Sequence, residues 1–165
     1  MFTIVKASEK DIPFISEIAS QTWPHTFKDI LSPKQIEYML DMMYSLGSLT
    51  KQVRDKNHVF YLAKDENKFV GYVSYELNCP TAYKTKIHKI YILPSVQGKG
   101  VGKLLMNKVA EIALKNNNTI LSLNVNRENK AIDFYEKYGF VKVGKEDIDI
   151  GNGFLMEDFI MEKQL

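Results

Sequence analysis

The stretch that decides the fold is IYILPSVQGKGVGKLLMNKVAEIAL, from Ile90 to Leu114. In it an apolar run ends in a turn that contains Gly98, Gly100 and Gly102, and a long amphipathic segment follows at once. Glycine loses more backbone freedom on ordering than any other residue, so a cluster of glycines where a helix begins indicates that bare backbone is needed there. We therefore predict a strand, a glycine turn and a helix in that order.

A strand that passes through glycines into a helix is typical of an anion site. The first N–H groups of the helix have no partner within it, and the helix dipole adds partial positive charge. Lys99 and Lys103 add further positive charge. The spacing differs from both the GxxxxGK[ST] loop and the GxGxxG fingerprint. Taken alone, the turn is compatible with a mononucleotide or dinucleotide site, and also with a tight connection that binds nothing.

The rest of the chain predicts a mixed α/β fold, with early helices, a meander and a β-α-β-α-β-β ending. Ser8 and Asp11 indicate the start of a first helix that breaks at Pro24, and a short helix is expected after Gly47. Gly139 indicates the end of the last helix. The expected strands are residues 2–7, 58–65, 68–77, 85–93, 119–126, 140–150 and 153–163, and the other expected helices are 32–44, 48–56, 102–114 and 129–139.

Composition sets limits on function. The 165 residues fit one domain spanning 1–165, with 45% apolar and 25% charged residues. A net charge of +2 gives no reason to expect nucleic acid as a partner. The single Cys79 excludes an internal disulfide framework and a multi-cysteine metal site, so we expect no metal and a reducing, cytoplasmic location. The N-terminus is too polar for a signal peptide, and no apolar run approaches ~20 residues, so no membrane partner is expected.

A second motif follows the strand expected at 119–126. The segment AIDFYEKYGF, residues 131–140, places Tyr135 and Tyr138 three positions apart on a helix, with Ile132 and Phe134 on its other side. A tyrosine in such a helix is either a functional group or an aromatic core residue whose hydroxyl finds a partner. The segment alone leaves both interpretations open.

The two motifs together resemble the GNAT N-acetyltransferases, which use acetyl-CoA. The run Gln97-Gly98-Lys99-Gly100-Val101-Gly102 matches their [Q/R]-x-x-G-x-[G/A] signature, and Ala131, Tyr135, Gly139 and Phe140 match A-x-x-x-Y-x-x-x-G-F. The resemblance covers most of the chain. It implies a mixed, mostly antiparallel central sheet of about seven strands flanked by helices, with the fourth and fifth strands splayed apart.

The resemblance extends to one branch of the family, the PaiA-like polyamine acetyltransferases. Segments 26–40, 89–93 and 102–114 are similar to that branch at matching places. This implies a small amine acceptor, spermidine or spermine. Acidic residues would attract its positive charge, and the candidates are Asp29, Glu37, Asp41 and Glu76. Two alternatives stay open, namely an acetyltransferase for a peptide amine, lysine or aminoglycoside, and a non-catalytic CoA-binding sensor. A nucleotide-binding protein that uses the same turn would leave the second motif unexplained.

The resemblance also implies a mechanism. The CoA diphosphate would bind the backbone amides of Gln97, Gly98, Lys99, Gly100, Val101, Gly102 and Lys103. The pantetheine arm would run between the fourth and fifth strands, held by backbone groups of Ile90, Tyr91 and Ile92. The amine would attack the thioester directly, so positioning and oxyanion stabilisation would supply most of the catalysis. Tyr135 would also contact the coenzyme and protonate the leaving thiolate as general acid.

An amine is mostly protonated at neutral pH, so the reaction needs a base. His88 is the leading candidate, acting directly or through water, and its alternative is an ordinary exposed strand residue. Glu76 is the second candidate base, and it would otherwise pair with a lysine. His25 is a candidate for lining the acceptor pocket, with a cap or turn role as its alternative.

Asparagines after the fifth strand are further candidates for contact with the coenzyme. Many relatives carry asparagine where this chain has Glu128, and Asn129 follows one place late. Asn126 lies close enough in sequence to substitute, and we expect Asn124 and Asn129 to contact CoA. Asn129 is alternatively a cap of the helix that follows. Related enzymes pair through their later strands, so we expect a monomer or a homodimer.

Overall fold

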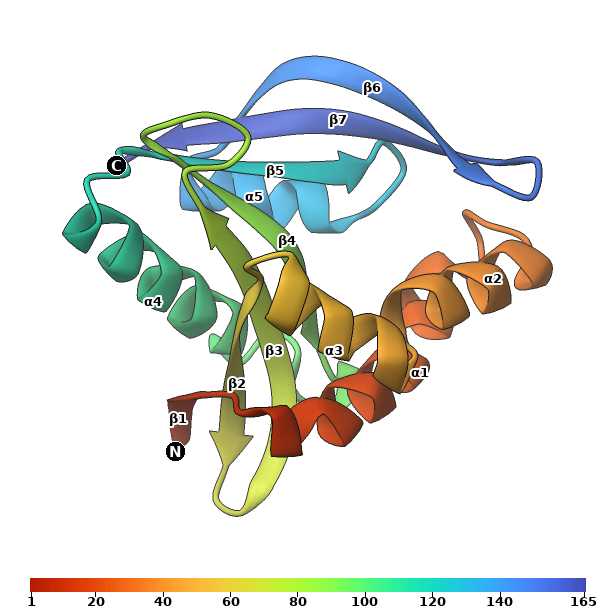
Figure 1. Ribbon diagram of the computed structural model, residues 1–165, viewed down its shortest axis with the longest axis horizontal. Coiled ribbons are helices and arrows are strands. Elements are labelled where there is room, and N and C mark those ends of the chain that lie inside the picture. Colours follow the sequence, from red (N-terminus) through yellow and green to blue (C-terminus); the bar gives the residue numbers. More distant parts are fainter. The chain divides into compact units, whose positions relative to one another are not determined.

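The computed structural model describes all residues, 1–165 (Figure 1). Its strands form a seven-stranded sheet in the order β1-β2-β3-β4-β5-β7-β6. Strands β4 and β5 are parallel over Lys84–Ile87 and Ile120–Leu123, whereas β1–β2, β2–β3, β5–β7 and β6–β7 are antiparallel. The predicted mixed sheet is therefore confirmed. Its strands are β1 Phe2–Lys6, β2 Val59–Asp65, β3 Lys68–Leu77, β4 Lys84–Ile92, β5 Ile120–Asn126, β6 Val141–Gly151 and β7 Phe154–Gln164.

The chain forms two compact units. Unit 1 comprises residues 1–76 and 88–109, and unit 2 comprises residues 77–87 and 110–165. The helices of unit 1 are α1 Ile12–Phe27, α2 Pro33–Tyr44 and α3 Leu46–Asp55; α4 Val101–Lys115 begins in unit 1 and ends in unit 2, and α5 Ala131–Tyr138 belongs to unit 2. The expectation of a single domain stays a prediction.

Local signals in unit 1 place the early helices largely where the sequence predicts them. Asp11 Oδ2 accepts a hydrogen bond from the backbone N–H of Ser8 at 2.8 Å, and α1 follows one turn of 3₁₀ helix. Ser32 caps α2, because its hydroxyl oxygen accepts from the backbone N–H of Gln35 at 3.1 Å. Proline at the first position of α2 suits this start, since its missing N–H would have had no partner there.

Two helix boundaries were predicted wrongly. Pro24 does not break α1, which continues to Phe27. Trp23 and Phe27 are both buried, with ring centroids 4.4 Å apart, and this packing maintains the helix across the lost backbone hydrogen bond. The third helix begins at Leu46 rather than after Gly47, because the Ser45 hydroxyl caps it by accepting from the backbone N–H of Ser48.

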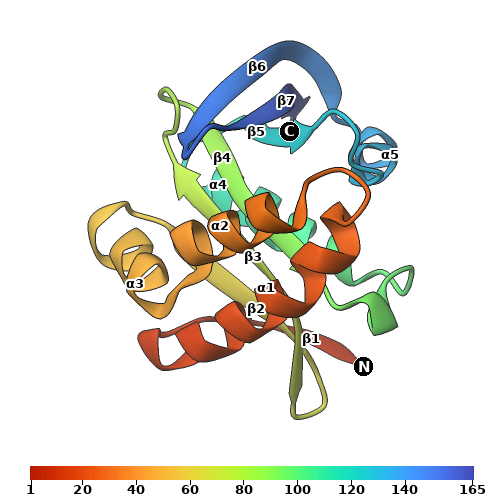
Figure 2. The ribbon, with the colours of Figure 1, turned by 90° about the vertical axis from the view of Figure 1, so that its right-hand side faces the viewer.

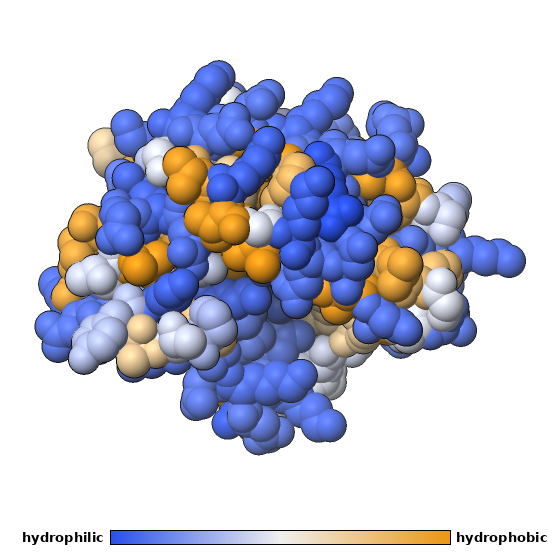
Figure 3. All heavy atoms as spheres, turned by 90° about the horizontal axis from the view of Figure 1, so that it is seen from above, coloured by the Kyte–Doolittle hydropathy of each residue, from blue (hydrophilic) through white to orange (hydrophobic).

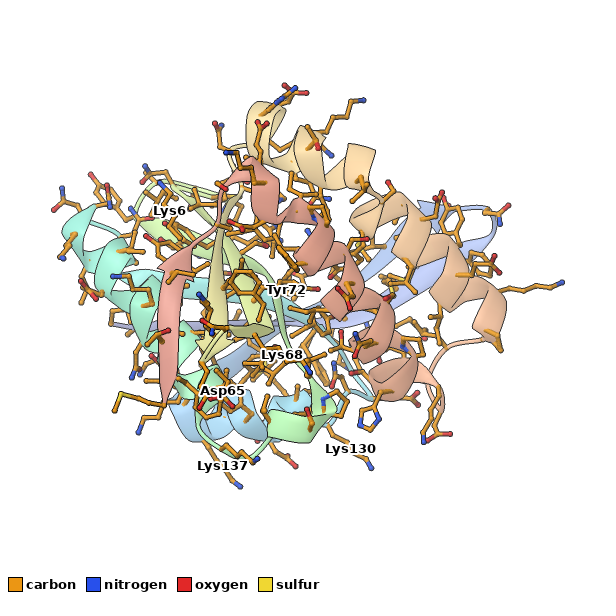
Figure 4. All side chains as sticks on the ribbon, turned by 90° about the horizontal axis from the view of Figure 1, so that it is seen from below. Lys6, Asp65, Lys68, Tyr72, Lys130 and Lys137 are labelled. Atoms are coloured by element: carbon orange, nitrogen blue, oxygen red, sulfur yellow. The ribbon has the colours of Figure 1, made fainter.

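Aromatic rings join the helices of unit 1 to its strands. Helices α1, α2 and α3 pack together beside β2 and β3 (Figures 1 and 2). Trp23 of α1 and Tyr44 of α2 meet Tyr91 of β4, with centroids 5.8 and 6.4 Å away. Tyr72 of β3 is fully buried beside Tyr44, and Figure 4 shows it in the interior of unit 1, while Asp65 and Lys68 mark the turn between β2 and β3. This aromatic core fixes the face of β3 and β4 on which the candidate site is built.

Helix α4 covers the opposite face of these strands. Lys108 of α4 lies over the ring of Tyr61 on β2, whereas the neighbouring Phe60 faces Tyr72 and the early helices. Buried apolar positions of α4 recur every four residues, as expected of a helix packed on one side: Val101, Leu105, Val109 and Ala113. The predicted amphipathic helix after the glycine turn is therefore confirmed, with its first residue at Val101.

In unit 2, α5 and the β6–β7 hairpin follow β5 as predicted. Gly139 has a φ of 115°, and its N–H and that of Phe140 both bond to the carbonyl of Tyr135, which ends the helix. Hairpin residues Val141, Val143 and Leu155 are each more than half exposed. Figure 3 looks onto the side where β6 and β7 lie in Figure 1 and shows hydrophobic patches among hydrophilic side chains.

No helix of the structure is both long and apolar enough to cross a membrane.

Candidate active site

The glycine turn has a backbone conformation that favours glycine. Gly98 and Gly100 have φ values of 78° and 86°, in the left-handed region where a Cβ is strained. A Cβ built on either residue would meet no protein atom within 4 Å. The glycines are therefore set by the turn geometry, and the space above them is open for a ligand. The sequence-based explanation, that glycine clears space, is only part of the reason.

The start of α4 leaves backbone N–H groups without partners, as an anion site requires, and the binding of an anion there stays a prediction. Leu104 donates the first backbone hydrogen bond of α4, to Gly100 O at 3.1 Å, so the N–H groups of Val101, Gly102 and Lys103 precede the hydrogen-bonded ladder. The Lys99 and Lys103 side chains are exposed. A phosphate-bearing group such as the CoA diphosphate fits this combination of unpaired amides, open space and positive charge.

The end of β4 is tied to the turn and to β3. Gln97 donates from its side-chain amide to Ile92 O at 3.0 Å. Leu93 N donates to Val70 O at 2.8 Å, and a Cβ on Gly71 would come within 3.0 Å of Tyr91 O. These contacts fix the backbone of Ile90–Ile92, whose side chains are half-buried.

Glu76 and His88, the two predicted base candidates, meet in unit 1. His88 Nε2 lies 3.0 Å from Glu76 Oε1, and the two side chains are 19% and 25% exposed. An ionised carboxylate only accepts hydrogen bonds, so the hydrogen lies on Nε2 and Nδ1 is the ring atom that can take a proton. The pair thus has the arrangement of a base oriented by a carboxylate.

His58, which no sequence pattern singled out, lies directly against this pair. Its ring stacks on His88 with centroids 3.8 Å apart and an angle of 14° between the planes. His58 Nε2 is 3.7 Å from Glu76 Oε1, and the buried Nδ1 has no hydrogen-bond partner. Burial, with the nearby charges of His88 and Lys89, lowers the pKa of His58 to about 3. His58 therefore stays neutral, and only one positive ring forms when His88 takes a proton.

Lys89 adds a buried amine to the same region. Its Nζ donates to Gln52 Oε1 at 2.7 Å and lies over the rings of Tyr44 and Phe60, 5.7 and 5.9 Å from their centroids. Burial, with a smaller effect of Lys56, lowers its pKa to about 8. Its contacts with an amide oxygen and two aromatic rings compensate part of the cost of burying the charge.

His58, Glu76 and His88 also present ligand atoms that lie within 4.8 Å of one another. Two histidines and a glutamate are a known ligand set for zinc. The nearly parallel rings direct their in-plane lone pairs side by side rather than toward one point, so one ring would have to turn before both nitrogens bound one ion. The geometry favours a proton site, and the expectation of no metal stays a prediction.

Tyr135 lies on α5, in unit 2. It is 7% exposed, and its ring packs against Phe134 and Phe140 with centroids 5.6 and 5.9 Å away. Burial raises the pKa of Tyr135 above its usual range, because the phenolate would be poorly solvated. Tyr135 therefore carries its proton at neutral pH, while the same burial makes the phenol a weaker acid toward a thiolate.

The asparagines of unit 2 differ in their partners. Asn129 Oδ1 accepts from the N–H of Ala131, the first residue of α5, at 2.9 Å, whereas the cap position itself is Lys130. Asn126 Oδ1 accepts from the N–H of Glu128 at 2.9 Å. The Asn124 side chain bonds to Lys86, Glu146 and Asp158. Their expected contacts with CoA stay predictions.

The remaining candidates lie on the helical segments of unit 1. His25 is exposed on α1, and Glu37 and Asp41 are exposed on α2. Asp29 is exposed between these helices. Of the acidic residues named for a cationic acceptor, only Glu76 is partly buried.

Comparison with known proteins identifies the class. The sequence profile of the Acetyltransferase (GNAT) domain matches residues 27–163. The chain is 30% identical to the spermidine N(1)-acetyltransferase of Thermoplasma acidophilum over 159 residues, which cover 93% of this chain and 94% of that relative. A shorter stretch of 61 residues, 36% of this chain and 38% of the relative, is 36% identical to the peptidyl-lysine N-acetyltransferase YjaB of Escherichia coli.

Among solved structures, the fold is similar to the PaiA N-acetyltransferase of Thermoplasma acidophilum, crystallised in complex with coenzyme A. The TM-score is 0.83 at 27% identity, covering 100% of this chain and 99% of that chain. The protein therefore belongs to the GNAT acetyltransferase family and has the GNAT fold. It is an N-acetyltransferase that takes its acetyl group from acetyl-CoA.

Proposed function

We propose that the protein acetylates a primary amine of a polyamine, with spermidine or spermine as the acceptor, in the cytoplasm. The observation that carries this proposal is the 30% identity, over nearly the whole chain, to a spermidine N(1)-acetyltransferase. The match extends through the early helices, which in this family contribute to the acceptor site.

In this proposal the glycine turn binds the donor. The amides of Gln97–Lys103 hold the diphosphate, and backbone groups of Ile90–Ile92 hold the pantetheine arm. Bound acetyl-CoA supplies the activated thioester. An amide near Ile92 stabilises the negative charge that develops on the carbonyl oxygen. Open space above Gly98 and Gly100 and the exposed lysines support this role.

The pair of His88 and Glu76 removes the proton from the acceptor ammonium. His88 Nδ1 takes the proton, and Glu76, 3.0 Å from Nε2, stabilises the resulting imidazolium. The neutral amine attacks the thioester carbon, and the C–S bond breaks as the tetrahedral intermediate collapses; the attacking nitrogen, positively charged after the attack, loses its second proton to water. Tyr135 gives its proton to the leaving thiolate and is reprotonated from solvent. Its contact with CoA, and those of Asn124 and Asn129, are part of this proposal.

A second candidate acceptor is a lysine side chain of a protein. The observation that favours it is the 36% identity over 61 residues to a peptidyl-lysine N-acetyltransferase. A polyamine and a lysine both present a primary ammonium on an alkyl chain, so the same base and the same acid serve both. The shorter extent of this match makes it the second candidate.

Release of free CoA thiol from acetyl-CoA tests the proposal, with spermidine, spermine, a lysine peptide, an aminoglycoside and no acceptor measured side by side. We expect turnover with the polyamines. Turnover only with the peptide would replace the acceptor and keep the mechanism. Binding of acetyl-CoA without turnover on any amine would favour a CoA sensor.

Tyr135→Phe tests the general acid. We expect kcat to fall by roughly 10²- to 10⁴-fold, the usual contribution of a positioned proton donor, with the Kd for acetyl-CoA little changed. Tyr138→Phe, three residues along the same helix, is the matched control and should retain turnover. Unchanged turnover in Tyr135→Phe near neutral pH would remove this residue from the mechanism.

A further inference from the structure

Strands β5, β7 and β6 of unit 2 bring a row of polar side chains to one face. Asn126 lies opposite Asp158 on β7, and Asp158 lies opposite Glu146 on β6. Directly opposed residues on paired strands project to the same face of a sheet. Asn124, two residues before Asn126, shares that face, and its Nδ2 donates to Glu146 Oε2 at 2.8 Å. Two carboxylates and two amides therefore lie on one face of the β5, β7 and β6 strands of unit 2.

Asp158 is the unusual member of this row. It is only 5% exposed, and its Oδ1 is buried without a hydrogen-bond partner. Its other oxygen accepts only a long contact, 3.4 Å, from Asn124 Nδ2. A buried carboxylate without a donor is costly, whereas an added donor with positive charge restores most of the lost solvation. Burial and the nearby Glu146 accordingly raise the pKa of Asp158, although the Asn124 contact opposes this.

The neighbouring cations do not satisfy this carboxylate. Lys86 Nζ donates to Asn124 Oδ1 at 3.3 Å. Arg127 donates from Nη2 to Asp147 Oδ1 at 2.5 Å and from Nε to the backbone oxygen of Asp158 at 3.2 Å. Neither side chain donates to the carboxylate of Asp158 or of Glu146. Glu146 is exposed, so a ligand from solvent can approach the row at its side.

The chemistry of the row favours an organic ammonium group over a divalent metal ion. Asn124 directs an N–H donor, not an oxygen, toward the two carboxylates. Magnesium and calcium take oxygen ligands, whereas the amide between the two carboxylates presents an N–H group to them. An alkyl ammonium carries N–H donors that match one buried and one exposed carboxylate, and charged hydrogen bonds of this kind are the strong ones.

We propose that Asp158 and Glu146, held together by Asn124, bind a second ammonium group of a polyamine acceptor, distinct from the amine that is acetylated. This inference rests on the proposed function, since only an acceptor with more than one amine uses such a subsite. The inference gives Asp158 and Glu146, which have no part in the proposed mechanism, a role in selecting the substrate. Asn124 would serve both this subsite and the expected contact with CoA.

Equilibrium binding of spermidine and of butylamine, which has a single amine, tests the subsite in Asp158→Asn, Glu146→Gln and the unaltered protein. We expect both variants to bind spermidine at least tenfold more weakly and to bind butylamine unchanged. In turnover, KM for spermidine should rise more than kcat falls. Glu157→Gln is the matched control, because Glu157 is the exposed neighbour of Asp158 on β7 and projects to the other face.

The outcomes separate the subsite from the proposed function. Wild-type affinity for spermidine in both carboxylate variants would overturn the inference, as would equal weakening toward butylamine or no spermidine binding by the unaltered protein. If Asp158→Asn fails to fold, the exposed Glu146→Gln decides alone. The variants could lose spermidine binding while the unaltered protein acetylates only peptides. That result would support the subsite and contradict the proposal that a polyamine is the acceptor. Magnesium that competes with spermidine would reassign the row to a metal ion.

Discussion

The glycine turn and the histidine cluster of unit 1 are built in opposite ways. The turn uses consecutive residues, Gln97–Lys103, and its open space and positive φ angles follow from the local chain. The cluster collects Glu76 from β3, His88 from β4 and His58 from just before β2, and holds them within hydrogen-bond or stacking distance. In the proposed mechanism the turn is a backbone site that binds the coenzyme, and the cluster is a side-chain site that moves a proton. Variants in the two regions should therefore affect different measurable quantities.

The largest expected effect is on turnover. Glu76→Gln removes the negative charge that stabilises imidazolium on His88, so kcat should fall by roughly 10²- to 10⁴-fold at neutral pH. The Kd for acetyl-CoA, measured by calorimetry, should not change. Glu66→Gln, in the turn between β2 and β3, controls for loss of a surface charge. If Glu76→Gln weakened acetyl-CoA binding as much as it lowered kcat, the assignment of binding to the turn and proton transfer to the cluster would be contradicted.

The converse effect is expected in the turn. Gly100→Ala forces a Cβ into a φ of 86°, which costs roughly 1–2 kcal/mol and displaces the amides that hold the diphosphate. Losing one charge-assisted hydrogen bond corresponds to roughly a tenfold to hundredfold weaker Kd for CoA. Turnover at saturating acetyl-CoA should fall much less. Unchanged CoA affinity together with reduced stability would show that the glycine serves only the fold.

A smaller effect concerns pH and His58. The folded pKa of about 3 lies below the ordinary 6.5, so between these pH values the unfolded chain binds more protons than the folded protein. The contribution of neutral His58 to the free energy of unfolding should therefore be fully present above about pH 6.5. It should be lost as the pH falls toward about 3. His58→Phe keeps a ring against His88 and removes the titrating group. Urea unfolding at pH 7 and pH 4.5 should show a smaller pH-dependent loss in this variant, and an identical loss would contradict the assignment.

The smallest expected effect is on stability, and it comes from comparing Gly47 with Gly100. Gly47 and Gly100 both have open space where a Cβ would lie, but only Gly100 has a positive φ. Gly47 lies inside α3, where alanine is the better helix former. Gly47→Ala should stabilise the protein by about 0.5–1 kcal/mol in urea unfolding, with CoA binding unaffected. Destabilisation would mean that α3 is constrained there by something other than helix propensity.

Local signals allowed most of the fold to be predicted. The Ser32 cap, the Gly139 helix end and the glycine turn each depend on a few neighbouring residues, and the structure has all three where the sequence indicated. Pro24 shows where such signals fail. A proline inside a helix is costly, but the buried contact of Trp23 with Phe27 outweighs that cost.

The sequence by itself also determined the chemistry of the single candidates, because glycine, tyrosine and histidine carry their properties wherever they lie. Only the tertiary structure decided which of them meet. Lys64 pairs with Phe69, but Ala63 pairs with Gly71, so a bulge at Val70 shifts the β2–β3 register by one residue. This shift places His58 on the same face as Glu76. A β2–β3 hairpin without the bulge would have placed His58 opposite Tyr75, on the face away from Glu76. The unpaired oxygen of Asp158 likewise follows from strand pairing, since burial and hydrogen-bond partners are properties of the folded chain.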